Sequence, residues 1–203
     1  MSVCFGFVNN ILDRLCFGSA LSTDVPHTRL RELPTIALDT EFMSKNAVII
    51  KNGSRLCGSG AALCNTPLTQ DKAYFEVKVQ QEGTWGVGVA TRDVDLNIIP
   101  LGNDLQSCVL RDDGNIYYNG KVVATLPEQA VEGDVIGITY DHEFISFYID
   151  GEPTNCSVSA PRAKTFYPAL YVDNSSILDS YFAEFQYRVP SGFHAIMMEQ
   201  TIL

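Results

Sequence analysis

Positively charged residues are scarce in this sequence and never cluster. Its 203 residues include 14 lysines and arginines against 24 aspartates and glutamates, which gives a formal net charge of −10. Phosphate backbones and anionic membrane surfaces bind proteins through several cations in register. We therefore expect no nucleic-acid partner and no binding to a membrane surface. An acidic balance is typical of a soluble protein and would also suit a basic partner.

Long apolar segments and targeting signals are lacking too. No stretch reaches the roughly 20 apolar residues that a membrane-spanning helix needs, and the N-terminus lacks the cationic start and small-residue cleavage site of a signal peptide. The six cysteines form no C-x-x-C pair, and no histidine lies near two of them, so we expect no zinc site. Cys108 sits in an apolar run, where a thiol behaves as a small hydrophobic group. We therefore predict reduced cysteines and an intracellular, cytoplasmic protein.

Residue sets that carry out catalysis are also missing. The sequence has no Gly-x-Ser-x-Gly elbow and no glycine-rich phosphate loop. His142 lies between two acids, but it joins two expected strands and is interpreted as part of a polar turn, not as a catalytic base. Acids such as Glu76 and Asp179 stand alone on their strands, without the facing carboxylate pair of a glycosidase. We therefore predict no catalytic residue, no cofactor and no enzymatic activity.

One connection nearly matches a calcium-binding loop. Asp93, Asp95 and Asn97 have the odd-position spacing of such a loop. Ile98 stands where a glycine is needed for the bend, and Asp104 stands where a longer glutamate would bind in bidentate fashion. We interpret this connection as a solvated loop and predict no metal site.

Apolar and polar residues alternate with a period of two in many segments of the sequence. Residues 74–80 (YFEVKVQ) place Phe75 toward a core and Glu76 toward solvent, as in a half-buried strand. Residues 85–91 (WGVGVAT) put bulky side chains on one face and small ones on the other, so another backbone or a large aromatic ring can approach closely. Similar strand-like segments cover residues 134–140, 145–150, 166–172 and 177–185.

Turn signals separate these segments. Asn-Gly or Asp-Gly pairs occur at residues 52–53, 113–114, 119–120 and 150–151, and such pairs tolerate the positive φ angles of tight hairpins. Short strands with these turns, and without alternating helices, predict an all-β antiparallel sandwich or barrel. The C-terminal residues 193–203 are left open between a helical turn and a last strand.

The chain is expected to hold one domain preceded by a tail. Residues 31–203 are assigned to the domain and residues 1–30 to the tail. Apolar residues recur in the tail at helical spacing, at Phe5, Val8, Leu12 and Leu15. This spacing fits a short amphipathic helix, and a loosely ordered tail is the alternative. Cys4 and Cys16 also leave palmitoylation of the tail open.

Five blocks of the sequence, taken in order, resemble the SPRY domain. They are residues 74–76 (YFE), 85–90 (WGVGVA), 132–137 (EGDVIG), 147–151 (FYIDG) and 166–170 (FYPAL). The resemblance implies a SPRY-type bent β-sandwich of two antiparallel sheets, a concanavalin-like jelly roll. It also implies a non-enzymatic adaptor that binds a partner protein or peptide through loops at one edge of the sandwich. A rigid scaffold can hold such loops without losing stability.

Three connections beside these blocks supply the predicted partner-binding residues. Residues 92–97, 104–106 and 173–175 contribute Arg92, Asp95, Asn97, Asp104, Asp173 and Asn174. Arginine can pair with a carboxylate in bidentate fashion, and asparagine can hydrogen-bond a peptide backbone. In peptide-binding relatives the loop after the Tyr-Pro-Ala strand carries an aromatic or apolar residue. Here residues 173–175 are polar, which implies a different ligand specificity.

A lectin-like carbohydrate-binding sandwich is the alternative function. Sugar sites on such sheets stack a sugar ring on an exposed aromatic side chain. The single tryptophan, Trp85, lies in a strongly alternating segment and is expected to be buried. The lectin-like function is therefore the weaker of the two hypotheses.

Overall fold

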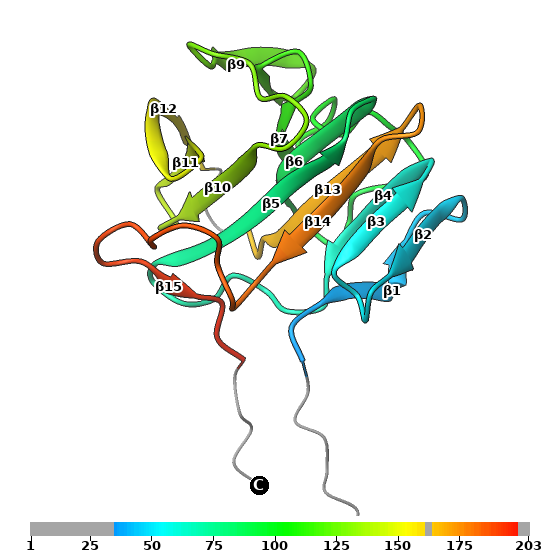
Figure 1. Cartoon of the computed structure of the whole chain (residues 1–203), viewed down its shortest axis with the longest axis horizontal. Helices are drawn as coiled ribbons and strands as arrows, with labels where there is room; N and C mark the ends of the chain where they lie inside the picture. The colour runs from blue at the N-terminus through cyan, green and yellow to red at the C-terminus, as the bar shows by residue number, and fades with distance from the viewer. Residues whose placement is uncertain (1–34, 161–163, 199–203) are drawn as a thin grey trace, which may run out of the picture. The chain divides into compact units, whose positions relative to one another are not determined.

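The computed structural model describes residues 35–160 and 164–198 as a domain of β-strands (Figure 1). The predicted N-terminal tail lies outside the described residues. Within them there is no helix, and so none that could cross a membrane. The strands are β1 (Leu38–Met43), β2 (Ala47–Ile50), β3 (Arg55–Gly58), β4 (Gly60–Cys64), β5 (Ala73–Gln81), β6 (Thr84–Ala90), β7 (Ser107–Arg111), β8 (Asn115–Tyr118), β9 (Lys121–Thr125), β10 (Val135–Tyr140), β11 (Phe144–Ile149), β12 (Glu152–Ser159), β13 (Tyr167–Asp173), β14 (Ile177–Tyr181) and β15 (His194–Ala195).

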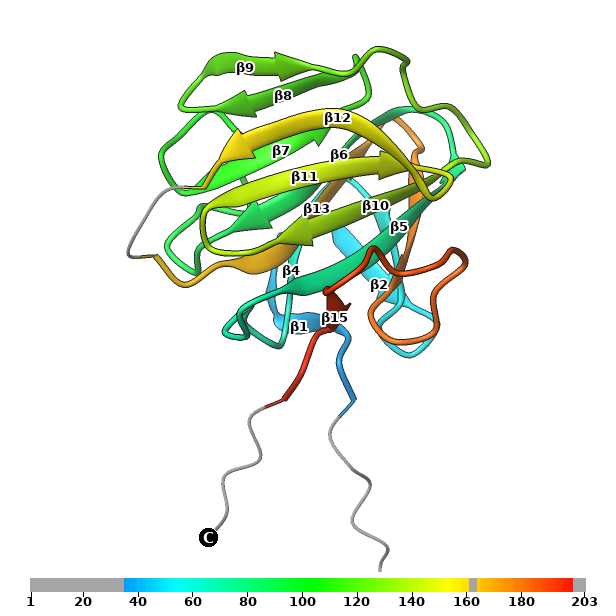
Figure 2. The same ribbon diagram turned by 90° about the vertical axis from the view of Figure 1, so that its left-hand side faces the viewer.

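Two sheets pack face to face (Figure 2). Sheet A has the order β1-β4-β13-β6-β7-β8-β9, and sheet B has the order β12-β11-β10-β5-β14-β3-β2. Neighbouring strands in both orders are antiparallel. The short strand β15 adds to β5 in parallel, so the C-terminal region forms a last strand at residues 194–195. The predicted fold class, an all-β sandwich of two antiparallel sheets, is confirmed.

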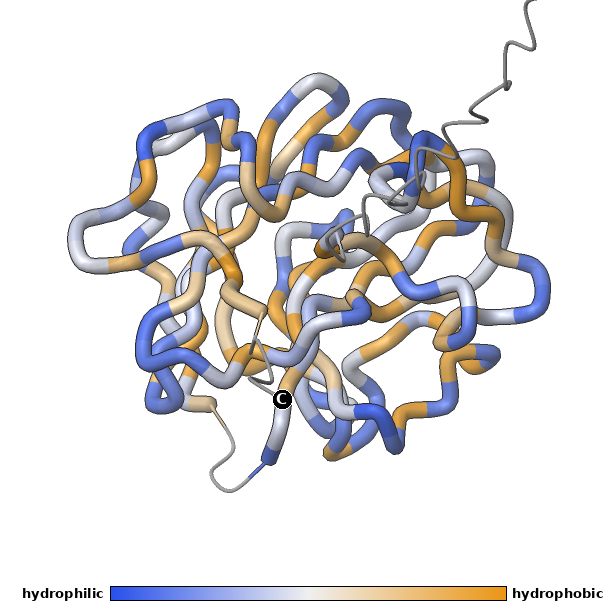
Figure 3. The backbone as a smooth tube through the Cα atoms, turned by 90° about the horizontal axis from the view of Figure 1, so that it is seen from below, coloured by the Kyte–Doolittle hydropathy of each residue, from blue (hydrophilic) through white to orange (hydrophobic). Residues whose placement is uncertain are grey.

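The core between the sheets is made by the alternating side chains. Phe75 and Val77 of β5 and Val87 of β6 are fully buried there, and Trp85 is only 2% exposed. Figure 3 shows hydrophobic residues alternating with hydrophilic ones along the strands, while hydrophilic residues prevail in the outer turns. Burial of one such side chain stabilises the fold by about 1.5–3 kcal/mol. The inward faces predicted for β5 and β6 are therefore correct.

All four predicted turn pairs join neighbouring strands. They lie between β2 and β3, β7 and β8, β8 and β9, and β11 and β12. Asn119-Gly120 and Asp150-Gly151 are two-residue turns in which both residues have positive φ angles, as a tight hairpin requires. Asn52-Gly53 also has positive φ angles, within a four-residue connection. These turns fix which residue of each strand faces its partner, and so which side chains enter the core.

One expectation for β5 was wrong, because Glu76 is fully buried instead of facing solvent. The chain leaves sheet B after Tyr181, short of the predicted strand end at residue 185, and residues 182–193 connect it to β15, covering Glu76 on the outer face of the sheet. We call this segment the C-terminal strap. Gln186 and Tyr187 donate their backbone N–H groups to the Glu76 carboxylate at 2.6 and 3.1 Å. A half-buried strand is thus covered on both faces.

Aromatic contacts hold the strap to the same place. The Phe185 ring meets the Tyr74 ring edge-on, with centroids 4.9 Å apart. The Tyr74 hydroxyl donates to Glu76 at 2.9 Å. Burial, together with this hydrogen bond, raises the pKa of Tyr74, so the hydroxyl keeps its proton. The strap and sheet B therefore share one buried polar centre.

Four cysteines lie in the described part of the chain, and all four are free: Cys57, Cys64, Cys108 and Cys156. Burial raises the pKa of the Cys64 and Cys108 thiols to about 12. A buried thiol that keeps its proton is unreactive. Cys108 therefore acts as the small hydrophobic residue that its apolar surroundings indicated.

A buried ion pair joins β3 to β14 on the outer face of sheet B. The Asp179 side chain is 7% exposed, and its carboxylate accepts hydrogen bonds from both Nε and Nη2 of Arg55. Lys51 reaches the same carboxylate at 3.2 Å. Burial alone raises the pKa of Asp179, but hydrogen bonds and positive charge from Arg55 and Lys51 outweigh it, so the pKa lies below its ordinary value.

We expect Asp179→Asn to lower the free energy of unfolding at pH 7 by about 2 kcal/mol, since it leaves Arg55 without its partner. A carboxyl group with a lowered pKa stabilises the fold above its unfolded pKa of about 3.9, and this stabilisation is lost as the pH falls through the folded pKa. Urea unfolding at pH 7 and pH 3 measures both effects. Lys51→Gln is the comparison: Lys51 is the more exposed partner of Asp179, so its loss should cost less. A deficit as large at pH 3 as at pH 7 would contradict the assignment.

Candidate functional site

The connection between β6 and β7, residues 91–106, carries most of the predicted binding residues. It is packed against the outer face of sheet A, where Val94, Leu96 and Leu101 are buried. The loop is therefore anchored by a small apolar cluster and is not the solvated turn that its polar residues indicated. Ile98 and Leu105 remain at least half exposed on its outer side.

Three of the predicted residues are used in hydrogen bonds that shape this connection. The Asp95 carboxylate accepts from the backbone and side-chain amides of Asn97 at 3.0 and 3.2 Å. The side-chain oxygen Oδ1 of Asn97 in turn accepts a hydrogen bond from the backbone N–H of Lys45 at 3.2 Å. Asp104 accepts from the backbone amides of Gln106 and Ser107 and from the Ser107 hydroxyl. These polar side chains shape the loop. Asp95 and Asn97, which have the spacing of a calcium-binding loop, hydrogen-bond each other in a turn.

Arg92 is held by aromatic rings. Its guanidinium carbon lies 3.7 Å from the ring centroid of Phe42 in β1 and 4.7 Å from that of Tyr167 in β13. Asp39 lies 3.5 Å from one guanidinium nitrogen. A cation over an aromatic face gains roughly 0.5–2 kcal/mol. Three segments that are distant in the sequence therefore fix the position of a side chain that is still 33% exposed.

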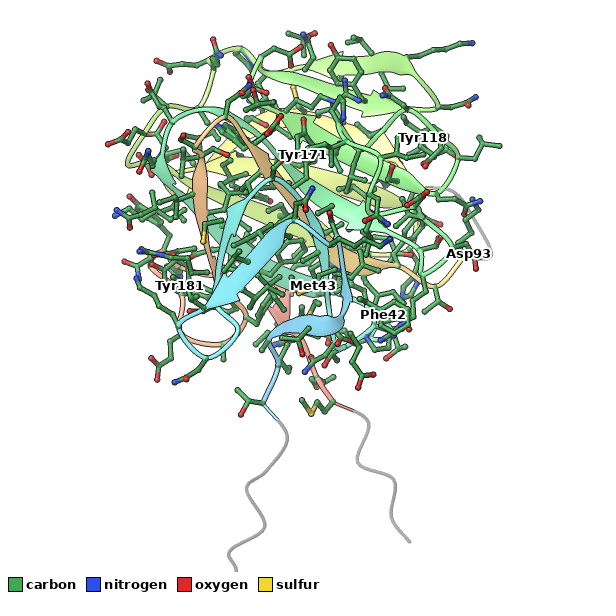
Figure 4. The ribbon with its side chains drawn as sticks, turned by 90° about the vertical axis from the view of Figure 1, so that its right-hand side faces the viewer. Phe42, Met43, Asp93, Tyr118, Tyr171 and Tyr181 are labelled. Carbon is green, nitrogen blue, oxygen red and sulfur yellow. The ribbon has the colours of Figure 1, made fainter. Side chains whose placement is uncertain are left out.

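Beside Arg92 the surface is hollowed. The cavity has a volume of about 400 Å³ and is lined by Thr91, Arg92, Asp93, Gln106, Lys164, Thr165 and Tyr167. We call it the β6–β13 hollow, because it lies where β6 ends and β13 begins. Figure 4 labels Asp93 and Phe42 on the same side of the view, below Tyr171.

A hydrogen-bond network holds the base of the hollow. Thr91 pairs with Gln106 twice, through the backbone at 2.8 Å and through the side chains at 2.9 Å. The Lys164 ammonium donates to the Gln106 side-chain oxygen at 3.2 Å and to the Leu105 carbonyl. The polar groups around the hollow are therefore held in place before any ligand arrives.

The predicted residues do not form a single site. Across the β6–β13 pairing, Tyr167 lies opposite Ala90 and Asp173 lies opposite Thr84. At about 3.3 Å per residue, the two ends of β13 are about 20 Å apart. In Figure 1 the connection from β13 to β14 lies at the upper right, away from the start of β13. Arg92 is thus at the hollow, while Asp173 and Asn174 are at the other end.

Asn174 also has a structural partner at that other end. It adopts a positive φ of 48°, and its side-chain amide donates to the Thr84 hydroxyl at 2.9 Å. Lys164, Tyr167 and Phe42 were not among the predicted binding residues. For Tyr167 the sequence offered the Tyr-Pro-Ala block, which predicted a strand. It did not predict that β1 would place the Phe42 ring near Tyr167.

A second hollow of about 390 Å³ lies between the β9–β10 connection and the β11–β12 turn. It is lined by Pro127, Glu128, Ile149, Asp150, Glu152, Pro153, Thr154 and Asn155. Its charged lining residues are all acidic. The two hollows therefore have similar volumes and opposite local charge.

His142 does not form part of a catalytic set in the structure. Its Nδ1 lies 3.3 Å from the Tyr140 hydroxyl, and its Nε2 lies 2.9 Å from the Gln70 carbonyl oxygen. Both ring nitrogens are therefore used in local hydrogen bonds. Among residues 35–160 and 164–198, no group of three or more His, Cys, Asp or Glu side chains is arranged to hold a metal ion.

Known proteins place this fold and sequence in one class. The SPRY domain family matches residues 72–184, so the chain belongs to the SPRY domain family. SPRY domains generally act as protein–protein interaction modules without enzymatic activity. The chain is similar to SPRY domain-containing protein 7 of Gallus gallus, with 49% identity over 178 residues that cover 87% of this chain and 90% of the relative. The proteins of that name from Mus musculus and Homo sapiens are 48% identical with the same coverage.

Solved structures support the same fold. The SPRY domain of human HERC1 superposes with a TM-score of 0.59 at 22% identity, covering 71% of this chain and 96% of that domain. The PSpry domain of TRIM65 superposes with the same TM-score at 12% identity, covering 73% of this chain and 90% of that domain. At these identities the likeness concerns the fold alone.

Proposed function

We propose that this protein is a non-enzymatic, intracellular adaptor that binds a partner protein or peptide in the β6–β13 hollow. One observation carries the proposal: a cavity of about 400 Å³ lies where the central strands β6 and β13 of sheet A meet their connections, and it is lined by fixed polar and charged side chains. A concave surface with a few convergent polar groups is typical of a binding site. Membership of a family of interaction modules supports the same function.

The rigidity of the hollow supports binding of a short segment. Arg92 is held between Phe42, Tyr167 and Asp39, and Gln106 joins Thr91 to Lys164. Groups that are ordered before binding cost less conformational entropy when the partner arrives. Exposed Leu105, whose carbonyl oxygen accepts a hydrogen bond from Lys164, provides apolar surface beside the polar groups of the hollow.

The lectin-like alternative has less support. Trp85 belongs to the core and is 2% exposed, so it cannot stack on a sugar ring. Tyr167 lines the hollow, but its ring already contacts the Arg92 guanidinium. We also expect no nucleic-acid partner, because the net charge of −10 would repel a phosphate backbone.

Filling the hollow tests the proposed function. Thr165 is exposed at its rim, and we expect Thr165→Trp to occupy the cavity and to reduce capture of partner proteins from cell extract at least tenfold. The matched control is Glu128→Trp, which places the same side chain in the second hollow. Quantitative mass spectrometry of proteins captured by the wild type and both variants gives the comparison. Equal capture by the wild type and Thr165→Trp would contradict the proposed site.

A further inference from the structure

We propose that the β6–β13 hollow binds a carboxylate, the side chain of an aspartate or glutamate in an acidic segment of the partner. The inference rests on the proposed function and adds the chemistry of the group that enters the hollow. The cavity is lined by two cations, Arg92 and Lys164, against one carboxylate, Asp93. The chain as a whole has 24 acids and 14 cations, so the lining of the cavity has the reverse balance, although Asp39 outside the lining offsets part of the Arg92 charge.

The donors of Arg92 are only partly used within the protein. A guanidinium carries five N–H donors in one plane, and among the described residues a single contact, to Asp39 at 3.5 Å, engages them. The Phe42 and Tyr167 rings hold the group by its π system. The in-plane N–H edge therefore remains for a ligand, and this fork matches the two oxygens of a carboxylate.

Lys164 and Thr165 provide donors on the facing side of the hollow. The Lys164 ammonium has three N–H donors and meets two acceptors, the Leu105 carbonyl and Gln106. Its third donor has no partner in the described part of the chain. Thr165 is exposed at the rim and adds a hydroxyl group. An acidic side chain in the cavity would thus meet donors from the residues that precede β13 as well as from Arg92.

The planar arginine fork matches the two oxygens of a carboxylate. A phosphate group carries nearly two negative charges and three acceptor oxygens, so a phosphorylated peptide is compared with the acidic one in the test below. The second hollow, lined only by acids among its charged residues, offers no such binding site for an anion. The net charge of the chain predicted a basic partner, whereas the local charge specifies an acidic residue at the point of contact.

Peptide selection followed by matched substitutions tests the inference. A phage-displayed library of random peptides, selected on the whole protein, should yield sequences enriched in aspartate or glutamate. Fluorescence anisotropy then measures one selected peptide and its forms with glutamine or phosphoserine at the acidic position. We expect the glutamine form to bind the wild type at least tenfold more weakly.

The protein variants separate the carboxylate from the hollow. Arg92→Gln and Lys164→Gln should each weaken the acidic peptide about tenfold or more and leave the glutamine form almost unchanged, while Glu128→Gln in the second hollow should change neither. Lys164 is only half-buried and lies outside the strands, so Lys164→Gln still tests the inference if Arg92→Gln fails to fold.

Each remaining outcome decides between the two proposals. Two results would contradict binding of a carboxylate but would keep the hollow as the binding site. In the first, the peptides that fail to bind Thr165→Trp carry no acidic residue. In the second, such peptides bind Arg92→Gln and Lys164→Gln as well as they bind the wild type. Tighter binding of the phosphoserine form would also contradict binding of a carboxylate. Peptides that bind Thr165→Trp as well as the wild type, or a library that yields no binder, would contradict the proposed function itself.

Discussion

Glu76→Ala is expected to lower the free energy of unfolding by about 3 kcal/mol and to release the C-terminal strap from sheet B. The Glu76 carboxylate is fully buried and accepts the backbone N–H groups of Gln186 and Tyr187 as well as the Tyr74 hydroxyl. A hydrogen bond to a charged group contributes roughly 1.5–3 kcal/mol. Alanine would remove the acceptor and leave its donors without partners.

Urea unfolding measures the loss, and amide hydrogen exchange at Gln186 and Tyr187 shows whether the strap opens locally. Glu76→Gln keeps one acceptor oxygen and should fall between the wild type and alanine. Lys78→Ala, at the next outward position of β5, is the control and should cost less than about 1 kcal/mol. Unchanged protection of both amides in Glu76→Ala would show that the strap is held by other contacts.

Gly88→Ala in β6 is expected to destabilise the fold by about 3 kcal/mol or to prevent folding. A Cβ atom at this position would lie 2.2 Å from the carbonyl oxygen of Cys108 and 2.8 Å from the Cα atom of Val109. Both atoms belong to the backbone of β7, so no side-chain rotation can relieve the contact. Overpacking of a core costs typically 1–3 kcal/mol, and more where the backbone must move.

Gly86→Ala provides a comparison within the same strand. Its Cβ atom would lie 2.1 Å from Cε1 of Tyr171, which is a side-chain atom. We therefore expect Tyr171→Ala to relieve part of the cost of Gly86→Ala but none of the cost of Gly88→Ala in a double-mutant cycle of unfolding free energies. Equal relief at both positions would contradict the close approach of β7 to Gly88.

Strands with local signals could be predicted from the sequence. Alternation in β5 and β6 fixed their core faces, and the Asn-Gly and Asp-Gly pairs located the hairpin turns. β12 was not predicted, because its sequence (EPTNCSVS) is polar and contains Pro153. It lies at the edge of sheet B, where a proline is tolerated, and it forms because the turn at Asp150-Gly151 pairs it with β11.

Features made by distant segments could not be predicted. Glu76 looked exposed because its cover comes from Gln186, which is 110 residues away. The candidate site has the same character: Arg92 was predicted from its loop, but Phe42 and Lys164 reach it from other parts of the chain. Asp173 and Asn174 were grouped with Arg92 by sequence, and only the antiparallel register of β6 and β13 separates them.

A photo-crosslinking amino acid at residue 165 or residue 174 tests most directly which end of β13 meets the partner. Thr165 lies at the β6–β13 hollow, and Asn174 is exposed at the far end of the same strand. The structure predicts that crosslinks to a captured partner form from residue 165 and are absent from residue 174. Crosslinks from residue 174 alone would place the partner at the opposite end and contradict the assignment of the hollow.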